Sequence, residues 1–263
     1  MPVSLEQILD STRQSLPALR ARRSELERNV LGEHLPRPSF RAALHRPHVA
    51  VIAELKRRSP SAGSIRENLD PGDRAALYAA SGAAAISVLT DTQYFGGSVD
   101  DLRMAAQRCA LPLLRKDFIL DEIQILEARA ASASAVLLIV RVLSATRLRQ
   151  LLRYAGDLGL DAVVEVHTAA ELSAALDAGS EVIGVNSRDL DTFAVDPEAA
   201  WRLVGQVPPD RIAVAESSVS SAADVARVAK AGADAVLVGT ALSASDAPEQ
   251  LLGELSTVVR RGR

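Results

Sequence analysis

Eight short apolar runs recur along the chain, each followed by a polar turn and then by a stretch rich in alanine and leucine. The runs have the length of β-strands and show little alternation between apolar and polar positions. Near-continuous apolar character is typical of parallel strands that are buried on both faces. The pattern therefore predicts strands at 49–55, 84–89, 111–114, 135–140, 162–166, 182–185, 212–215 and 235–238.

Stretches with helical periodicity separate these runs. In 169–178 and 222–231 apolar residues recur at helical spacing, and Gly179 and Gly232 follow where they can cap the helices. Eight strand–helix units favour an α/β fold of the closed (β/α)8 TIM-barrel type over an open doubly wound sheet, which usually has five or six strands. An open sheet with an appended domain is the alternative, but no Gly-x-Gly-x-x-Gly motif follows the first run.

The residues before the first strand form a separate pattern, with apolar positions near helical spacing that Pro17 interrupts. We expect one or two amphipathic helices, packed on the barrel through Leu5, Ile8, Leu9, Leu16, Leu19, Leu26 and Val30. Residues 36–39 read as a linker, in which Ser39 can cap a short helix that reaches Leu44. The chain is thus expected to be a single barrel domain over 1–263, with 1–48 as an N-terminal helical extension.

Charge and cysteine content exclude several classes of protein. The 263 residues carry 30 positive and 33 negative side chains, and a net charge of -3 offers no field for a nucleic acid or an anionic membrane. One cysteine, Cys109, excludes an internal disulfide framework and suits a reducing compartment. No window approaches 18 apolar residues, and the N-terminus lacks a secretion segment. We therefore expect a cytoplasmic protein without nucleic-acid or membrane partners.

Polar residues continue the inward-facing side of several strands past their ends, where the active site of a barrel lies. Five strands contribute such residues, which are Glu54, Lys56, Lys116, Glu165, Asn186, Arg188 and Glu216. A single charge in such a place is usually a solvated loop residue, but a cluster of buried charges is usually retained for function. Arg57 and Arg115 are instead expected to face solvent or to pair with helices. The four histidines lack metal-binding spacing, so no metal site is expected.

The turns after the last two strands have the composition of a phosphate site. Ser217 and Ser218 follow one strand, while Gly239 and Thr240 follow the other. Turns at these places commonly offer backbone N–H groups and a helix N-terminus to a phosphate. A glycine without a Cβ lets the backbone approach a ligand. The pattern predicts a phosphorylated small-molecule substrate.

Aromatic residues also fall just beyond strand ends. Phe95 and Phe118 are candidates for an apolar wall beside the charges. Tyr94 is a third candidate, but its side chain can equally face solvent. Such a wall suits a ligand with a planar ring and an anionic tail.

At these residues the sequence resembles the indole-3-glycerol phosphate synthase family over nearly its whole length. The resemblance rests on ordered motifs at 52–61, 87–91 with 94–98, 114–119, 164–167, 184–190 and 214–217. The N-terminal extension looks like the extra helices with which the family covers the mouth of its barrel. One residue departs from the pattern, because the family usually has Glu-Ser-Gly where this chain has Glu216-Ser217-Ser218.

The resemblance implies a substrate and a reaction. The substrate would be 1-(2-carboxyphenylamino)-1-deoxyribulose 5-phosphate, which is closed to an indole with loss of carbon dioxide and water. Lys116 would be the general acid at the ketone, and Lys56 would hold anionic groups and act in the later dehydration. Glu165 and Glu54 would stabilise positive charge and remove a proton, with the division between them open. No organic cofactor is implied.

The remaining residues that match the motifs would bind the substrate. Asn186, Arg188 and Glu216 would orient it, and Ser59 would meet its carboxylate. The aromatic ring would be enclosed by Phe95, Phe118, Leu137, Ile139 and Leu190.

Two expectations concern energetics. A lysine near other cations in a pocket of low dielectric can have its pKa drawn toward neutrality, which suits Lys116 as an acid, although nearby carboxylates oppose that shift. A serine at position 218 carries a penalty if its backbone needs a positive φ or a close approach to the phosphate. We expect Ser218 to keep its N–H toward the phosphate.

Two other functions are possible. Another phosphosugar barrel, such as phosphoribosylanthranilate isomerase, would need an acid–base pair that is typically cysteine and aspartate, whereas the first strand here ends in Glu54 and Lys56. A barrel retained only for binding is the other alternative, although every catalytic position of the family is filled. Protein partners and oligomeric state are not indicated by the sequence.

Overall fold

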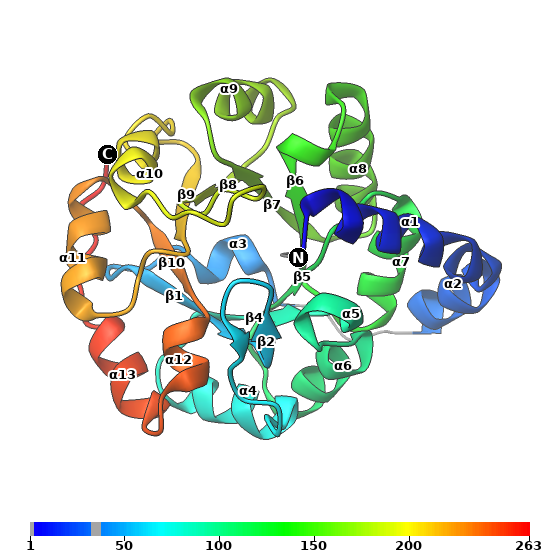
Figure 1. The fold of residues 1–263 in the computed structure, drawn as a ribbon, viewed down its shortest axis with the longest axis horizontal. Helices are drawn as coiled ribbons and strands as arrows, with labels where there is room; N and C mark the ends of the chain where they lie inside the picture. The colour runs from blue at the N-terminus through cyan, green and yellow to red at the C-terminus, as the bar shows by residue number, and fades with distance from the viewer. Residues whose placement is uncertain (1–2, 33–37) are drawn as a thin grey trace.

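Eight parallel strands close into a barrel in the computed structural model, which describes residues 3–32 and 38–263 (Figure 1). The order around the barrel is β1-β10-β9-β8-β7-β6-β5-β4. The strands are β1 (Ala50–Leu55), β4 (Ala85–Leu89), β5 (Leu113–Lys116), β6 (Ala135–Ile139), β7 (Asp161–Val166), β8 (Val182–Asn186), β9 (Ile212–Glu216) and β10 (Ala235–Val238). The predicted (β/α)8 barrel is confirmed, and the open-sheet alternative is wrong.

An outer ring of helices surrounds the strands (Figure 1). Its members are α4 (Pro71–Ala80), α6 (Val99–Arg108), α7 (Glu122–Ala130), α8 (Ala145–Asp157), α9 (Ala169–Asp177), α10 (Pro197–Val204), α11 (Ala222–Lys230) and α13 (Pro248–Leu255). Gly179 and Gly232 follow α9 and α11 with positive φ, as the predicted helix ends require.

Small elements lie among the connections that follow the strands. They are the two-stranded ribbon β2 (Arg58–Ser59) and β3 (Gly63–Ser64), and the short helices α5 (Thr92–Phe95), η1 (Val140–Val142) and α12 (Thr240–Ala244). These connections carry the residues that surround the mouth of the barrel. No helix among the described residues is long and apolar enough to span a bilayer.

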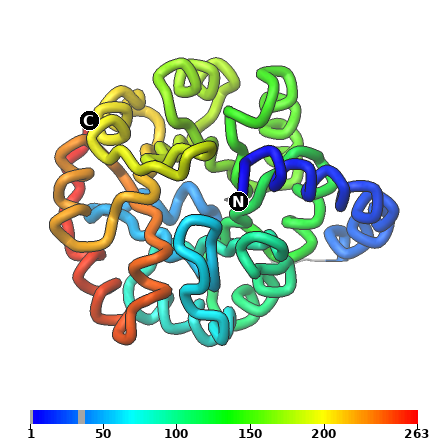
Figure 2. Tube along the Cα trace, viewed as in Figure 1, coloured from blue at the N-terminus to red at the C-terminus, as the bar shows by residue number. Residues whose placement is uncertain are grey.

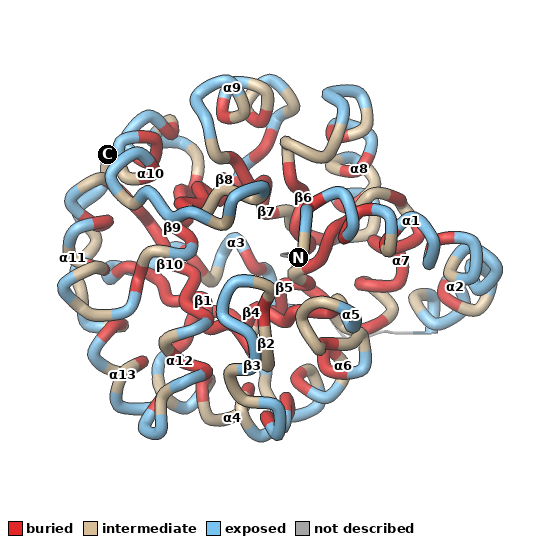
Figure 3. Tube along the Cα trace, in the orientation of Figure 1, coloured by how far each residue is buried: buried red, intermediate tan, exposed pale blue. Residues whose placement is uncertain are grey.

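Alternate residues of each strand serve two separate hydrophobic cores. Ile52 and Leu114 belong to the set inside the barrel, whereas Val51 and Leu113 belong to the layer between strands and helices. Figure 3 shows the strands as an almost continuous buried region beneath more exposed helices. Burial of both strand faces explains why the sequence shows continuous apolar runs.

The N-terminal extension forms α1 (Leu5–Ala21), α2 (Arg23–Gly32) and α3 (Phe40–Ala43). In Figure 2 α1 and α2 run from near the centre of the barrel to its edge. The expected interruption at Pro17 is wrong, because α1 continues through that residue and ends near Arg22. Buried apolar side chains that precede Pro17, Ile8 and Leu16 among them, hold α1 in place despite the lost hydrogen bond.

The predicted cap of the third helix is confirmed. The Ser39 Oγ accepts a hydrogen bond from the Ala42 N–H, and the helix ends at Leu44. Residues 36 and 37 of the expected linker lie outside the described residues.

Arg115 points from β5 toward the outer helices and is only 3% exposed. Its guanidinium lies 3.0 Å from Glu127 and 3.1 Å from Asp117. Arg57 likewise pairs with Asp101 of α6. For both arginines the pairing alternative is therefore the correct one, and solvent exposure is not.

Candidate active site

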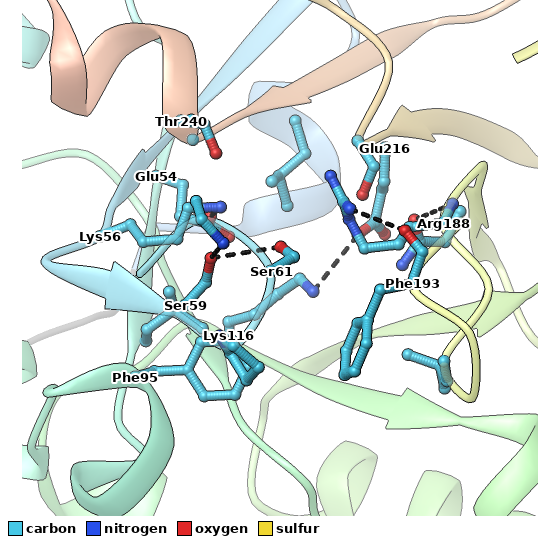
Figure 4. Close-up of a pocket in the computed structure, with 18 of the residues that line it drawn as sticks. Glu54, Lys56, Ser59, Ser61, Phe95, Lys116, Arg188, Phe193, Glu216 and Thr240 are labelled. Carbon is cyan, nitrogen blue, oxygen red and sulfur yellow. Dashed lines mark hydrogen bonds and ion pairs between the residues drawn. The ribbon is translucent and has the colours of Figure 1, made fainter. Parts of the chain in front are cut away.

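One cavity of about 620 Å³ opens at the carboxyl ends of the strands and is drawn in Figure 4. Every site residue that the sequence predicted lines it, which are Glu54, Lys56, Ser59, Phe95, Lys116, Phe118, Leu137, Ile139, Glu165, Asn186, Arg188, Leu190, Glu216, Ser217, Ser218, Gly239 and Thr240. Barrel closure brings together residues that are far apart in the sequence. In Figure 4 the Lys116 ammonium lies between Glu54 and Lys56 on one side and Arg188 and Glu216 on the other.

Lys116 stands at the centre of a group of carboxylates. Its Nζ donates to Glu165 Oε2 at 3.3 Å and lies 3.4 Å from Glu216 Oε2. The two carboxylates are each only 1% exposed. Gly184 makes this packing possible, since a Cβ at that position would lie 2.2 Å from Glu216 Oε1.

The surroundings of Lys116 raise its pKa above the ordinary lysine value. Burial by itself lowers that pKa, but the charges of Glu165, Glu216 and Glu54 outweigh the burial. The expectation that the pKa of Lys116 is drawn toward neutrality is therefore wrong for the protein without substrate. The reason is that separate strands bring three carboxylates to one ammonium group.

The two carboxylates that contact Lys116 differ in acidity. Burial raises the pKa of Glu165, but Lys116 and His167 outweigh it, so the net shift is downward. Burial raises the pKa of Glu216 to about 7, against the opposing effect of Lys116 and with the support of Glu165 and Glu54. At neutral pH the site thus holds one carboxylate that is fully ionised and one that is close to its midpoint.

Glu54 and Lys56 form a second ion pair on the wall of the same cavity. Lys56 Nζ lies 3.1 Å from Glu54 Oε1, and Ser87 Oγ donates to Glu54 Oε2 at 3.5 Å. A Cβ on Gly239 would lie 2.1 Å from Glu54 Oε1. The missing side chain of Gly239 therefore makes room for this carboxylate, a role that the sequence did not indicate.

An apolar wall lies beside these charges. The rings of Phe95 and Phe118 are tilted by 40° with centroids 6.4 Å apart, and Leu137 and Ile139 lie in the same core cluster. Tyr94 does not line the cavity, and its hydroxyl donates to the Gln7 carbonyl of α1 at 3.2 Å.

Sequence reasoning missed part of this wall. Phe193, from the connection after β8, also lines the cavity, as do Leu5 and Ile8 of α1. The position of Phe193 beyond a strand end is a signal that could have found it, since Phe95 and Phe118 share it. Leu5 and Ile8 were expected only to pack on the barrel, because helical spacing does not indicate where a helix docks.

Arg188 reaches the cavity without a carboxylate partner. Its Nη1 donates to the Phe193 carbonyl at 3.0 Å, and none of the ion pairs between described residues includes it. Burial lowers the pKa of Arg188. A partly buried guanidinium with only a neutral acceptor is well suited to an anionic ligand.

The turn after β9 places its backbone strain one residue earlier than expected. Ser217 has a φ of 73°, whereas Ser218 is not among the described residues with positive φ. Position 218 therefore carries no penalty from a positive φ. Instead the Ser218 Oγ is buried and has no hydrogen-bond partner among the described residues.

A closed (β/α)8 barrel with buried acids and bases at the carboxyl ends of its strands defines a TIM-barrel enzyme. The family model described as indole-3-glycerol phosphate synthase matches residues 5–255. The chain therefore belongs to the indole-3-glycerol phosphate synthase family.

Curated relatives support the family, and solved structures support the fold. The chain is 43% identical to the indole-3-glycerol phosphate synthase of Desulfosudis oleivorans, covering 96% of this chain and 98% of the relative. It is 46% identical to that of Koribacter versatilis, covering 97% and 99%. Among solved structures, thiamine phosphate pyrophosphorylase from Pyrococcus furiosus has a TM-score of 0.57 at 17% identity, covering 79% of this chain and 93% of that one. A mandelate oxidase structure has a TM-score of 0.58 at 20% identity, covering 72% and 67%, so both show the fold alone.

Proposed function

We propose that the protein converts 1-(2-carboxyphenylamino)-1-deoxyribulose 5-phosphate to indole-3-glycerol phosphate, carbon dioxide and water, a decarboxylating lyase reaction of tryptophan biosynthesis. Membership of the family supports this reaction. The single observation that carries it is the position of Lys116 between Glu165 and Glu216, in a cavity that also holds an aromatic wall and the unpaired Arg188.

Lys116 acts in the first step, in which the ring carbon that bears the carboxylate attacks the ketone carbon. Its ammonium group donates a proton to the ketone oxygen as the new carbon–carbon bond forms. The raised pKa keeps the donor charged before reaction. Lys116 therefore contributes a positioned charge that stabilises the developing alkoxide as well as a proton.

Glu165 acts on the positive charge that this attack places on the ring and the anilino nitrogen. Its lowered pKa keeps it ionised, and an anion in a buried site stabilises such a cation strongly. Loss of carbon dioxide then leaves the indoline, and loss of the hydroxyl as water completes the indole. We assign the dehydration to Lys56 as the acid that protonates the departing hydroxyl and to Glu54, beside it, as the base that takes the proton from the adjacent ring carbon.

The substrate's anionic groups match the cations and hydrogen-bond donors of the cavity. Arg188 and Lys56 face the carboxylate and phosphate, and Ser59 meets the carboxylate. The phosphate is placed at the turns after β9 and β10, formed by Ser217, Ser218, Gly239 and Thr240. The unpartnered Ser218 hydroxyl and the first N–H groups of α12 supply donors there.

The aromatic ring of the substrate is placed against the wall formed by Phe95 and Phe118, and is enclosed with them by Leu137, Ile139 and Leu190. This position leaves the ring carbon near Lys116. Holding a flexible chain with its reacting carbons in contact supplies a large part of the acceleration. Asn186 and Glu216 orient the substrate and Lys116.

The extension 1–48 acts with the barrel as one unit in this proposal, because Leu5 and Ile8 contribute to the cavity. A cytoplasmic location is proposed from the charge balance and from the lone Cys109, whose thiol pKa is raised by burial. The substrate is the only partner that the reaction needs.

Incubation of the purified protein with the substrate tests the proposal through the fluorescence of the indole product and through carbon dioxide release. We expect both products in equal amounts. Binding without turnover would favour the binding barrel. Rearrangement of phosphoribosylanthranilate without ring closure would favour the isomerase.

A further inference from the structure

His167 follows Glu165 by two residues on the inward side of β7, and its side chain is 5% exposed. It does not line the cavity. Its Nε2 lies 3.4 Å from Glu165 Oε1, and both atoms are buried without a hydrogen-bond partner among the described residues. The imidazole thus stands behind the oxygen of Glu165 that Lys116 does not contact.

The other side of the imidazole is held by α9. Glu171 Oε2 lies 3.2 Å from His167 Nδ1 and accepts from the His167 backbone N–H at 2.6 Å. A neutral imidazole has only one N–H and therefore faces one of the two carboxylates without a proton, whereas the imidazolium directs an N–H and a positive charge toward both. The arrangement therefore favours the charged form.

The series of ion pairs that begins at Glu165 and His167 continues to the connection between β8 and α10. Arg141 of η1 lies 3.3 Å from Glu171 and 2.9 Å from Asp189, and it also reaches Asp191 at 3.2 Å. Asp189 in turn accepts from the backbone of Asp191 and Thr192. This connection carries Arg188, Leu190 and Phe193 into the cavity.

We propose that His167 is a positioning residue that fixes Glu165 through an imidazolium and, with Glu171 and Arg141, couples this carboxylate to the substrate-binding connection after β8. The inference rests on the proposed function, because it takes Glu165 as the group that stabilises the reacting cation. The charged groups that face His167 are Glu165 from β7, Glu171 from α9 and Arg141 from η1.

The balance of these charges agrees with the proposal. Burial and Arg141 lower the pKa of His167, but Glu171 and Glu165 outweigh them, so the net shift is upward. Protonation of His167 in turn contributes to the lowered pKa of Glu165. Loss of the imidazolium would therefore leave Glu165 easier to protonate and less firmly oriented.

Nuclear magnetic resonance of the histidine side chains tests the charge directly in the intact protein. The chain has four histidines, so His167→Gln assigns the signal by its disappearance. We expect the His167 pKa to lie above the ordinary value and to fall in both Glu165→Gln and Glu171→Gln. An ordinary pKa that is unchanged by these substitutions would overturn the proposal, and this measurement does not depend on activity.

Kinetics test the positioning role. We expect His167→Gln to lower kcat about tenfold or more while KM changes little, and to remove the fall in kcat/KM at high pH that accompanies deprotonation of His167. His167→Asn is the second variant should the first fold poorly, with circular dichroism as the check. If a folded His167 variant keeps the kcat and the pH profile of the wild type, the inference is wrong and the proposed function is unaffected. If the wild-type protein itself does not form the indole, the proposed function is wrong.

Coupling to the connection after β8 is tested with Arg141→Met, alone and combined with His167→Gln. We expect the single variant to raise KM and the two effects on kcat/KM to be non-additive. Arg147→Met is the matched control, because Arg147 pairs with Glu122 and Asp121 away from the cavity. The coupling would be contradicted if the effects of Arg141→Met and His167→Gln on kcat/KM were additive, as we expect for Arg147→Met.

Discussion

Arg115 and Lys116 are neighbours on β5, yet they serve two different charged clusters on opposite faces of the strand. Arg115 faces the helices, where it contacts Asp117 and Glu127 and donates to the Gln124 carbonyl at 2.8 Å. Lys116 faces the cavity and contacts Glu165 and Glu216. Both cations are largely or fully buried, and each has carboxylates within ion-pair distance.

The two clusters differ in how completely their polar atoms are paired. All buried polar atoms of Arg115, Asp117 and Glu127 have partners, whereas one oxygen of Glu165 and one of Glu216 have none among the described residues. Unpaired buried polar atoms cost stability, and such a cost is usually tolerated where a ligand completes the site. The comparison distinguishes a cluster that holds the fold from a cluster that awaits a substrate.

Removal of the cavity ammonium should have the largest effect on turnover. We expect Lys116→Met to lower kcat by about 10³-fold, near the middle of the range for a general acid, because it removes both the proton donor and the charge at the ketone. Substrate binding, measured by titration calorimetry, should persist. Turnover near that of the wild type would refute the acid assignment.

Removal of the structural cation should instead affect stability. Arg115→Met leaves Asp117 and Glu127 buried without their partner, which should cost about 3–5 kcal/mol in the free energy of unfolding by urea. Arg115→Lys keeps the charge and should cost less. The kcat of the folded fraction should stay close to that of the wild type, and a loss like that of Lys116→Met would erase the distinction between the clusters.

Glu216→Gln should show that the cavity cluster costs stability in a pH-dependent manner. The folded-state pKa of about 7 lies above the unfolded value of 4.5, so the wild type loses stability through this group as pH rises from about 4.5 to 7. Gln avoids this loss, and the advantage of the variant should grow by about 3 kcal/mol between pH 4.5 and pH 8. Urea unfolding at the two pH values measures it, and a constant difference would argue against the raised pKa.

The smallest effect is expected at the phosphate turn. Ser218→Gly removes a buried hydroxyl without relieving backbone strain, since the positive φ belongs to Ser217. KM should rise only about 2- to 10-fold, the value of one hydrogen bond. Ser218→Ala is the matched control and should behave alike. A much larger rise for Gly would show that position 218 does more than donate one hydroxyl.

Much of the site follows from strand periodicity. Glu54, Lys116 and Glu165 were found because alternate residues of a strand share a face and because parallel strands in a barrel end at one rim. Phe193 and the contact of His167 with Glu165 were not found. Both depend on the path of a connection, which is set by contacts between distant segments.

The sequence by itself determined the barrel, because eight apolar runs can bury both faces only as parallel strands covered by helices. It also determined most of the charged side chains that reach the cavity, although Asp91 and Asp117, which line it too, were not predicted. Only the tertiary structure decided where α1 docks and that it continues through Pro17. The same is true of the positive φ at Ser217 and of the upward shift of the Lys116 pKa. The physical reason is that docking, turn conformation and acidity depend on groups from different strands, whose distances are set only when the barrel closes.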